Sequence, residues 1–296
     1  MNARHPYGRL AYCEALAAAA GEAACDAPEW ASAVVRRPIA GGGADAAGPY
    51  PRTPLTPEAD LAGGLERLRD LGLVSVVLVP DPLIAPDAAA LAAAFPVCRP
   101  FKRHLVIDRR IGPYAPSKHH RYEMRRAQQR CDVEVVALAQ HLDDWTRLYA
   151  GLAQRHEIAG PAAFSAAYFA LMAADPSYEV FAARAGGEIV AMAIWFRHAG
   201  VAVNHLGASD AAGYAVGASY ALYDAAIQRY GECERIDLGG AAGLAEAADD
   251  GLSRFKRGFA NAEATAFVCG AVLDEAAYAR LAAGRSGDGF FPAYRR

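Results

Sequence analysis

The order of strands and helices in the second half of the chain restricts its fold more than any other feature. Apolar and β-branched runs predict strands at 133–137, 178–184, 188–197, 201–208, 235–238 and 264–272. Helical patterns lie at 142–156, 162–173 and 216–230, and a helical or loop stretch follows residue 238. The turns at Gly186-Gly187 and Gly200 are short enough to join three successive strands as hairpins. The order is therefore β-α-α-β-β-β-α-β-α-β, which predicts an α/β (α+β) domain with a mixed sheet flanked by helices.

The first half alternates strands and helices as well. Its predicted elements are a helix at 10–20, a strand at 30–39, a loop at 41–55, a helix opened by Thr56-Pro57-Glu58, a strand at 74–79, a helix at 87–95 and a strand at 104–108. A bend with two prolines at 111–117 then leads into a basic helix at 118–130. The sequence thus predicts two domains, 1–117 and 118–296, the second opened by the basic helix.

Composition excludes several classes of protein. With 54% hydrophobic and 21% charged residues, the 296-residue chain is able to form a large core and is not globally disordered. Charges or prolines interrupt every apolar stretch before it reaches the ~18 residues of a membrane span, and the N-terminus lacks an apolar signal segment. Six scattered cysteines and eight histidines form no metal-ligand spacing. We therefore expect a cytoplasmic protein with no metal site and no membrane span.

Positive charge is concentrated in one segment. Residues 99–130 hold ten basic and two acidic side chains, whereas the whole chain has a formal net charge of −3. Arg121, Arg125 and Arg126 lie in the predicted helix of this segment. Such a contrast predicts an anionic partner that binds one patch, and pairing of these arginines with acids elsewhere in the fold is the open alternative.

Several short motifs give the chain a family resemblance. The second half contains Asp237-Leu238-Gly239-Gly240 at a strand end, followed by the run Gly251 to Phe259, which includes Phe255-Lys256. The first half contains a segment from Asp45 to Tyr50, and the basic helix lies between the two halves. These motifs resemble those of Fem-type aminoacyl-tRNA-dependent peptidyltransferases, and the element order is that of the GNAT acyltransferase fold.

The resemblance implies two GNAT-like lobes, each a mixed twisted sheet flanked by helices, with a cleft between them. It also implies transfer of an acyl group to an amine, with Lys256 and Phe255 close to the reacting ester and Asp45 and Tyr50 at the acceptor side. No charged heptad segment provides the long helical arm of some cell-wall members. A small peptide, a natural product and a cell-wall precursor all stay open as acceptors.

Further candidates lie on strands and loops of the second half. Asp237 and Gly239 end a strand, where they are expected to orient the acceptor amine or to maintain the shape of the cleft. His205 is on the strand that a GNAT fold splays open beside the acyl site, so it is a candidate base or hydrogen-bond partner of the donor. Tyr220 is a candidate donor to a leaving oxygen. For each of the last two residues, simple packing in the core is the alternative.

The motif expected to bind the acyl donor is weaker than the motifs above. Residues 213–219 stand where GNAT acetyltransferases place a glycine-rich loop whose backbone N–H groups bind the coenzyme A pyrophosphate, which makes Gly217 and Ala218 candidates. Tyr214 occupies the position of the usual arginine or glutamine, and this departure favours aminoacyl-tRNA over coenzyme A as the donor.

The sequence therefore predicts an acyltransferase that moves an aminoacyl group from charged tRNA to an amine, with no bound cofactor. A coenzyme A-dependent N-acyltransferase and a non-catalytic GNAT-like binding protein are the alternatives. The sequence does not determine the transferred group, the acceptor or the oligomeric state.

Overall fold

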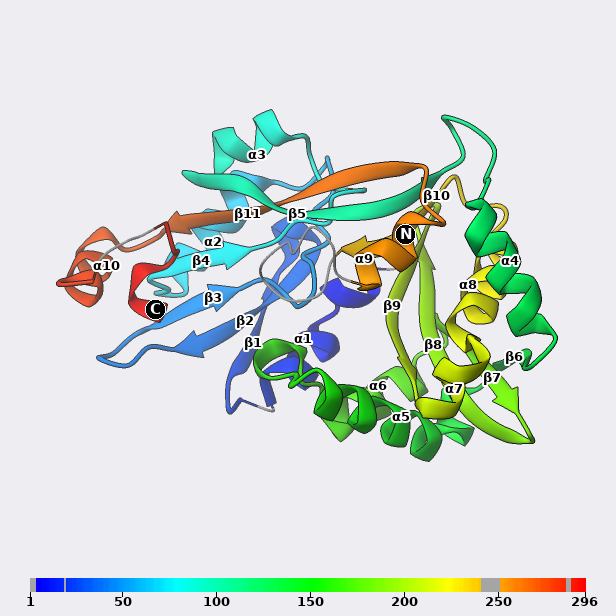
Figure 1. The fold of residues 1–296 in the computed structure, drawn as a ribbon. Coiled ribbons are helices and arrows are strands. Elements are labelled where there is room, and N and C mark those ends of the chain that lie inside the picture. Colours follow the sequence, from blue (N-terminus) through cyan, green and yellow to red (C-terminus); the bar gives the residue numbers. More distant parts are fainter. Residues whose placement is uncertain (1–3, 19, 241–250, 286–288) are drawn as a thin grey trace. The chain divides into compact units, whose positions relative to one another are not determined.

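In a computed structural model, the chain forms two compact units. The structure describes residues 4–18, 20–240, 251–285 and 289–296. The first unit comprises residues 1–101 and 265–296, and the second comprises residues 102–264 (Figure 1). The sequence-based division at 117/118 assigns residues 102–117 to the first domain and residues 265–296 to the second, so the two partitions differ at both ends.

The second unit is built around a mixed sheet. Its strands are β5 (Val97–Asp108, which begins in the first unit), β10 (Arg235–Gly240), β9 (Val201–Ser209), β8 (Glu188–His198), β7 (Tyr178–Ala185) and β6 (Asp132–Val136), in that spatial order. Strands β7, β8 and β9 form an antiparallel meander, as the short glycine turns predict, and β6 pairs antiparallel with β7 at the edge of the sheet. Strand β10 is parallel to β9, and the last residues that pair between them are Asp237 and Val203. The two parallel strands therefore separate at Asp237.

Helices cover this sheet. They are α4 (Lys118–Gln128), α5 (Leu142–Arg155), α6 (Ala166–Ala174), α7 (Ala211–Val216), α8 (Ala218–Arg229) and α9 (Gly251–Arg257). Helices α4 and α8 lie side by side (Figure 1). The buried residues of α4 are His120, Met124 and Ala127, which recur at the spacing of one helix face. Met124 and Ala127 join the core formed by α8 and the sheet, so the basic residues of α4 face outward.

The first unit has its own mixed sheet, in the order β1 (Ala23–Ala27), β2 (Ser32–Pro38), β3 (Ala44–Ala47), β4 (Ser75–Leu78) and β11 (Ala262–Val272, which begins in the second unit). Strands β3 and β4 are parallel and the other pairs are antiparallel. Its helices are α1 (Leu10–Ala18), α2 (Leu61–Asp70), α3 (Ala88–Ala94) and α10 (Glu275–Ala282). Cys269 of β11 pairs with Leu78 of β4, which explains why the end of the chain belongs to this unit.

The predicted α/β class with mixed sheets and flanking helices is confirmed, but three local predictions are wrong. Helix α2 begins at Leu61 rather than near Thr56, because Asp60 caps it by accepting from the Gly63 N–H at 2.9 Å. The predicted loop at 41–55 contains β3, which gains its strand partners from β2 and β4. Residues 213–219 are not a loop, because they belong to α7 and α8 and to Gly217 between them.

Within the described residues, none of the helices is both long and apolar enough to cross a membrane.

Candidate functional site

The end of β10 brings four polar groups of the second unit together. Asp237 is fully buried where β10 leaves β9, and its Oδ1 accepts a hydrogen bond from the Gly239 N–H at 2.7 Å. Gly239 has a φ of +84°, and a Cβ built there would lie 2.9 Å from Nζ of Lys256. The positive φ therefore favours glycine at 239, and a side chain there would displace the end of Lys256.

Lys256 reaches this strand end from α9. Its side chain is buried, and Nζ donates a hydrogen bond to the carbonyl oxygen of Gly240 at 2.9 Å. The predicted Lys256, Asp237 and Gly239 thus lie within one small group of contacts. An ammonium held by a backbone carbonyl beside a strand end is a compact positive charge in a largely desolvated place, where it interacts more strongly than in water.

His104 of β5 completes this group, although the sequence analysis did not single it out. It pairs with Gly240 in the sheet, and its Nδ1 lies 3.0 and 3.1 Å from the two carboxylate oxygens of Asp237. A carboxylate accepts, so Nδ1 carries the hydrogen, and in the neutral ring Nε2 is the nitrogen that accepts a proton. A buried carboxylate that orients an imidazole is the arrangement found where histidine works as a general base. The only sequence signal for it is a histidine at the start of the predicted strand 104–108.

Phe255 lies in a cluster of aromatic rings next to Lys256. Its ring centroid is 5.0 Å from that of Tyr220 and 4.8 Å from that of Tyr223, with edge-on geometry. His120 closes the cluster, and its Nε2 donates to the Phe255 carbonyl at 2.7 Å. Phe255 and Tyr220, both predicted site residues, are therefore packed together, and burial raises the pKa of the Tyr220 hydroxyl.

His120 is a buried neutral residue of this cluster. Ser117 Oγ donates to its Nδ1 at 2.9 Å, and burial lowers the pKa of the ring below its usual value. A Cβ at residue 258 would lie 1.9 Å from His120 Cε1, so only glycine fits there. The ring thus fixes the turn after α9, and with it the position of Lys256.

His205 belongs to a second aromatic group on β9. Its Nε2 lies 2.7 Å from the Tyr168 hydroxyl, and its ring also contacts those of Phe164 and Tyr178. The structure gives it a hydrogen-bond partner inside the unit, and its role in the reaction stays a prediction.

The predicted donor-binding glycine lies between two helices. Gly217 has a φ of +74°, ends α7 and starts α8, while Ala218 is fully buried in the core. Gly213 is explained by packing, because a Cβ there would lie 2.4 Å from the Val190 carbonyl oxygen. The arrangement retains a helix start at Ala218 but replaces the expected loop by a helical turn.

The three arginines of α4 differ in their contacts. Arg121 Nη1 donates to the Pro116 carbonyl at 2.6 Å, and Arg126 lies 3.6 Å from Glu123 on the same helix. The Arg125 side chain is exposed and makes no hydrogen bond or ion pair within the described part of the chain. An exposed basic face of this kind is suited to phosphate contacts.

The first unit contains the two predicted acceptor residues. Asp45 is fully buried in β3, and its carboxylate contacts Arg37 Nε at 2.9 Å, Arg295 Nη2 at 2.9 Å and the Tyr294 hydroxyl at 3.1 Å. Tyr50 is 40% exposed, and its carbonyl accepts from the Tyr12 hydroxyl at 2.7 Å. These contacts give Asp45 a structural part within its unit, while acceptor binding by either residue stays a prediction.

No group of three or more His, Cys, Asp or Glu side chains suited to a metal ion occurs among the described residues.

Comparisons with known proteins bear on the fold. Residues 117–257 match the family model of the acetyltransferase (GNAT) domain. The chain is similar to the crystal structure of FemX, with a TM-score of 0.63 at 12% identity over 93% of this chain and 94% of that one. No curated protein sequence matches it.

Two further solved structures are similar. L-PGS from Bacillus licheniformis gives a TM-score of 0.59 at 13% identity, with 88% of this chain and 86% of that chain covered. The C-terminal domain of a putative lysylphosphatidylglycerol synthetase from Agrobacterium fabrum gives 0.56 at 18% identity, with 84% and 82% covered. The GNAT-type, Fem-like fold predicted from the sequence is therefore confirmed.

Proposed function

Since this chain is a GNAT-superfamily protein with a Fem-like fold, we propose that it is an acyltransferase that moves an aminoacyl group from aminoacyl-tRNA to an amine. The observation that carries the proposal is the contact group at the end of β10, where Lys256 binds the Gly240 carbonyl beside the His104–Asp237 pair. The similarity to FemX and to lysylphosphatidylglycerol synthetases, whose name denotes attachment of a lysyl group, supports an aminoacyl donor.

The reaction needs one bond to form and one to break. The acceptor nitrogen attacks the ester carbonyl carbon of the donor, which gives a tetrahedral intermediate with a negative oxygen. The bond from that carbon to the ribose oxygen then breaks, so that an amide remains. The nitrogen loses a proton, the ribose oxygen gains one, and no electrons are transferred to or from an external group.

Lys256 supplies charge where negative charge develops. Its ammonium is a compact positive charge positioned at the Gly240 carbonyl, and such a charge is suited to stabilise the oxyanion or the departing ribose oxygen. Loss of one such donor typically costs ~10²–10³ in rate. The neighbouring Phe255 and Tyr220 orient this end of α9, and Gly239 leaves room for the ammonium.

His104 is the proposed general base. Its Nε2 takes the proton of the attacking amine while Asp237 stabilises the imidazolium that forms, and this proton then passes to the ribose oxygen. The Asp237 carboxylate contacts His104 directly, and Lys256 Nζ binds the carbonyl of Gly240, which is paired with His104 in the sheet.

We propose that the donor and the acceptor bind to residues outside the contact group at the end of β10. Phosphates of tRNA contact Arg121, Arg125 and Arg126 on the outer face of α4, and the backbone at Gly217-Ala218 and the His205 side chain lie on the donor side. The acceptor is a small amine or peptide, and Asp45 and Tyr50 are the residues proposed to bind it. Charged tRNA as cosubstrate implies a cytoplasmic reaction.

The decisive experiment is a reconstituted reaction that contains the protein, tRNA charged with radiolabelled amino acids, and a panel of amine acceptors. We expect labelled amide product that disappears when the tRNA is first digested with ribonuclease. Product from acyl-coenzyme A in the absence of tRNA would replace the proposed donor by a thioester. Tight amine binding without turnover on any donor would instead identify a non-catalytic protein.

Two variants test the roles within the site. Lys256→Ala is expected to lower kcat by ~10²-fold or more with little change in donor affinity. His104→Gln is expected to lower kcat by ~10²-fold and to remove the acid limb of the pH–rate profile. His141→Gln is the matched control, because His141, at the start of α5, also pairs with an aspartate, Asp144 at 3.3 Å, and is not part of the contact group at the end of β10. Equal losses in His104→Gln and His141→Gln would exclude His104 as the base.

A further inference from the structure

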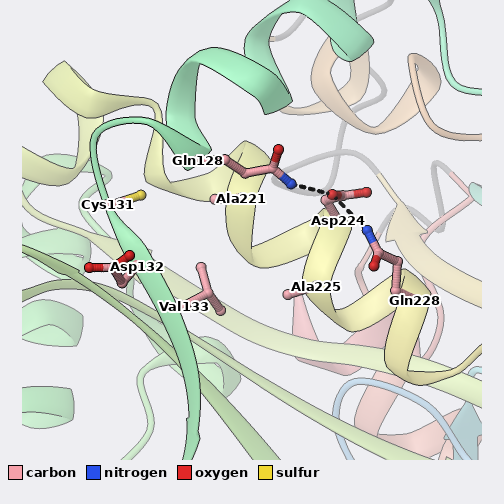
Figure 2. Close-up of a pocket in the computed structure, with 8 residues that line it drawn as sticks. All are labelled: Gln128, Cys131, Asp132, Val133, Ala221, Asp224, Ala225 and Gln228. Carbon is pink, nitrogen blue, oxygen red and sulfur yellow. Dashed lines mark hydrogen bonds between the residues drawn. The ribbon is translucent and has the colours of Figure 1, made fainter.

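A small pocket lies between α4, α8 and β6 in the second unit (Figure 2). It has a volume of about 230 Å³ and is lined by polar and small apolar side chains. The lining residues are Gln128, Cys131, Asp132, Val133, Ala221, Asp224, Ala225 and Gln228. None of them belongs to the contact group at the end of β10, so this pocket is independent of the proposed acyl transfer.

Asp224 is the central polar group of the pocket. It is only 8% exposed, and its Oδ2 accepts hydrogen bonds from the Gln128 amide at 2.8 Å and the Gln228 amide at 2.9 Å (Figure 2). The two amides come from different helices and hold the carboxylate in one orientation. Both amides are neutral, so they satisfy one oxygen but bring no positive charge to the carboxylate.

No cation of the described chain lies within ion-pair distance of this carboxylate. Asp224 makes no ion pair within residues 4–18, 20–240, 251–285 and 289–296. Arg109, which reaches the same end of α8, donates instead to the carbonyls of Ile227 and Cys233. Buried carboxylates are normally paired, because removal of a charge from water costs several kcal/mol per ion.

The rest of the pocket also favours positive charge. Its lining contains a second carboxylate, Asp132, and no Lys, Arg or His. Gln128 is the last residue of α4 and Gln228 lies in the last turn of α8, so both helices direct their negative dipole ends toward this region. Carboxylates and helix C-termini together attract a cation that donates hydrogen bonds.

We propose that this pocket binds the primary ammonium group of a small aliphatic amine, with Asp224 as its counter-ion. Oδ1 of Asp224 accepts from the ammonium while the two glutamine amides hold Oδ2. The alkyl chain contacts Val133, Ala221 and Ala225, which are the apolar part of the lining. The site is thus a second amine-binding place, separate from the residues proposed for catalysis.

The test is calorimetric titration of the full chain with 1,4-diaminobutane at constant ionic strength. We expect saturable binding that weakens by at least about tenfold in Asp224→Asn, since the variant keeps the shape and loses the charge. Glu232→Gln, which alters an exposed carboxylate of the same unit, is the control and is expected to bind like the parent. Butanol and tetramethylammonium should not bind, because the first lacks charge and the second lacks N–H donors.

A second measurement does not depend on the variant. Carbon-13 spectra of aspartate-labelled protein report whether the Asp224 carboxyl is ionised at neutral pH and whether its signal shifts on addition of diaminobutane. An ionised carboxylate that shifts supports the proposal. Equal binding by the parent and Asp224→Asn, no binding by the parent, or a protonated Asp224 that does not respond would each overturn it.

Discussion

The burial of Asp45 leads to a prediction about stability. Its carboxylate is inaccessible to solvent and contacts Arg37, Tyr294 and Arg295, so it connects β3 to β2 and to the C-terminal residues of the first unit. Asp45→Asn keeps the shape of the side chain but removes its charge. It also places an amide N–H₂ against guanidinium donors, so that hydrogen bonds are lost as well as charge.

The expected loss of stability in Asp45→Asn depends on how exposed its two arginine partners are. Removal of one member of a buried ion pair costs about 3–5 kcal/mol, because the remaining charge stays desolvated and unpaired. The side chains of Arg37 and Arg295 are 22% and 27% exposed, so water partly solvates their charges when Asp45 is neutralised. We therefore expect a loss of stability at the lower end of this range. A loss of about 3 kcal/mol corresponds to a fall of roughly 6–12 °C in Tm for a unit of this size.

Thermal unfolding followed by circular dichroism measures this shift. Asp26→Asn is the matched control, because Asp26 pairs with Arg4 at 2.6 Å but both side chains are more than a third exposed, and such pairs contribute at most about 1 kcal/mol. The acceptor KM is then determined well below the Tm of each variant. An unchanged Tm in Asp45→Asn together with a raised acceptor KM would refute the structural reasoning and favour the acceptor role instead.

Three other predictions follow from the second unit. Gly258→Ala is expected to destabilise the protein by about 1–3 kcal/mol in urea titrations, because its Cβ would overlap His120, and His120→Ala in the same chain should recover part of the loss. Because burial lowers the pKa of His120, the unfolded chain binds more protons than the folded one below about pH 6.5. The free energy of unfolding should therefore fall as the pH drops through that value. The measurement is the urea midpoint of the parent and of His120→Gln at about pH 5.5 and 7.5. If the midpoint changes between the two pH values as much in the variant as in the parent, His120 is not the cause. Replacement of Arg125 and Arg126 by Gln should reduce the dependence of log Kd for tRNA on log salt by about 0.7–0.9 per contact in filter-binding assays, and an equal slope in parent and variant would argue against phosphate contacts by α4.

The sequence by itself determined the elements whose signals are local. The apolar runs of β7, β8 and β9 and the short glycine turns between them define the meander, because strand alternation and turn geometry depend on neighbouring residues. The basic face of α4 and the Lys256 motif are visible for the same reason, since charge and motif spacing are read directly from the chain. Each of these features needs only residues within one segment.

Only the tertiary structure decided which distant residues meet. His104 and Asp237 are 133 positions apart, and their pairing arises because β5 and β10 are neighbours in one sheet. Strand β3 is short and consists of three alanines and Asp45, so it has no strand pattern of its own and forms through its hydrogen bonds to β2 and β4. The buried charge of Asp45 likewise depends on Arg295, which lies 250 positions away. Such contacts depend on the relative positions of whole strands, which no local periodicity specifies.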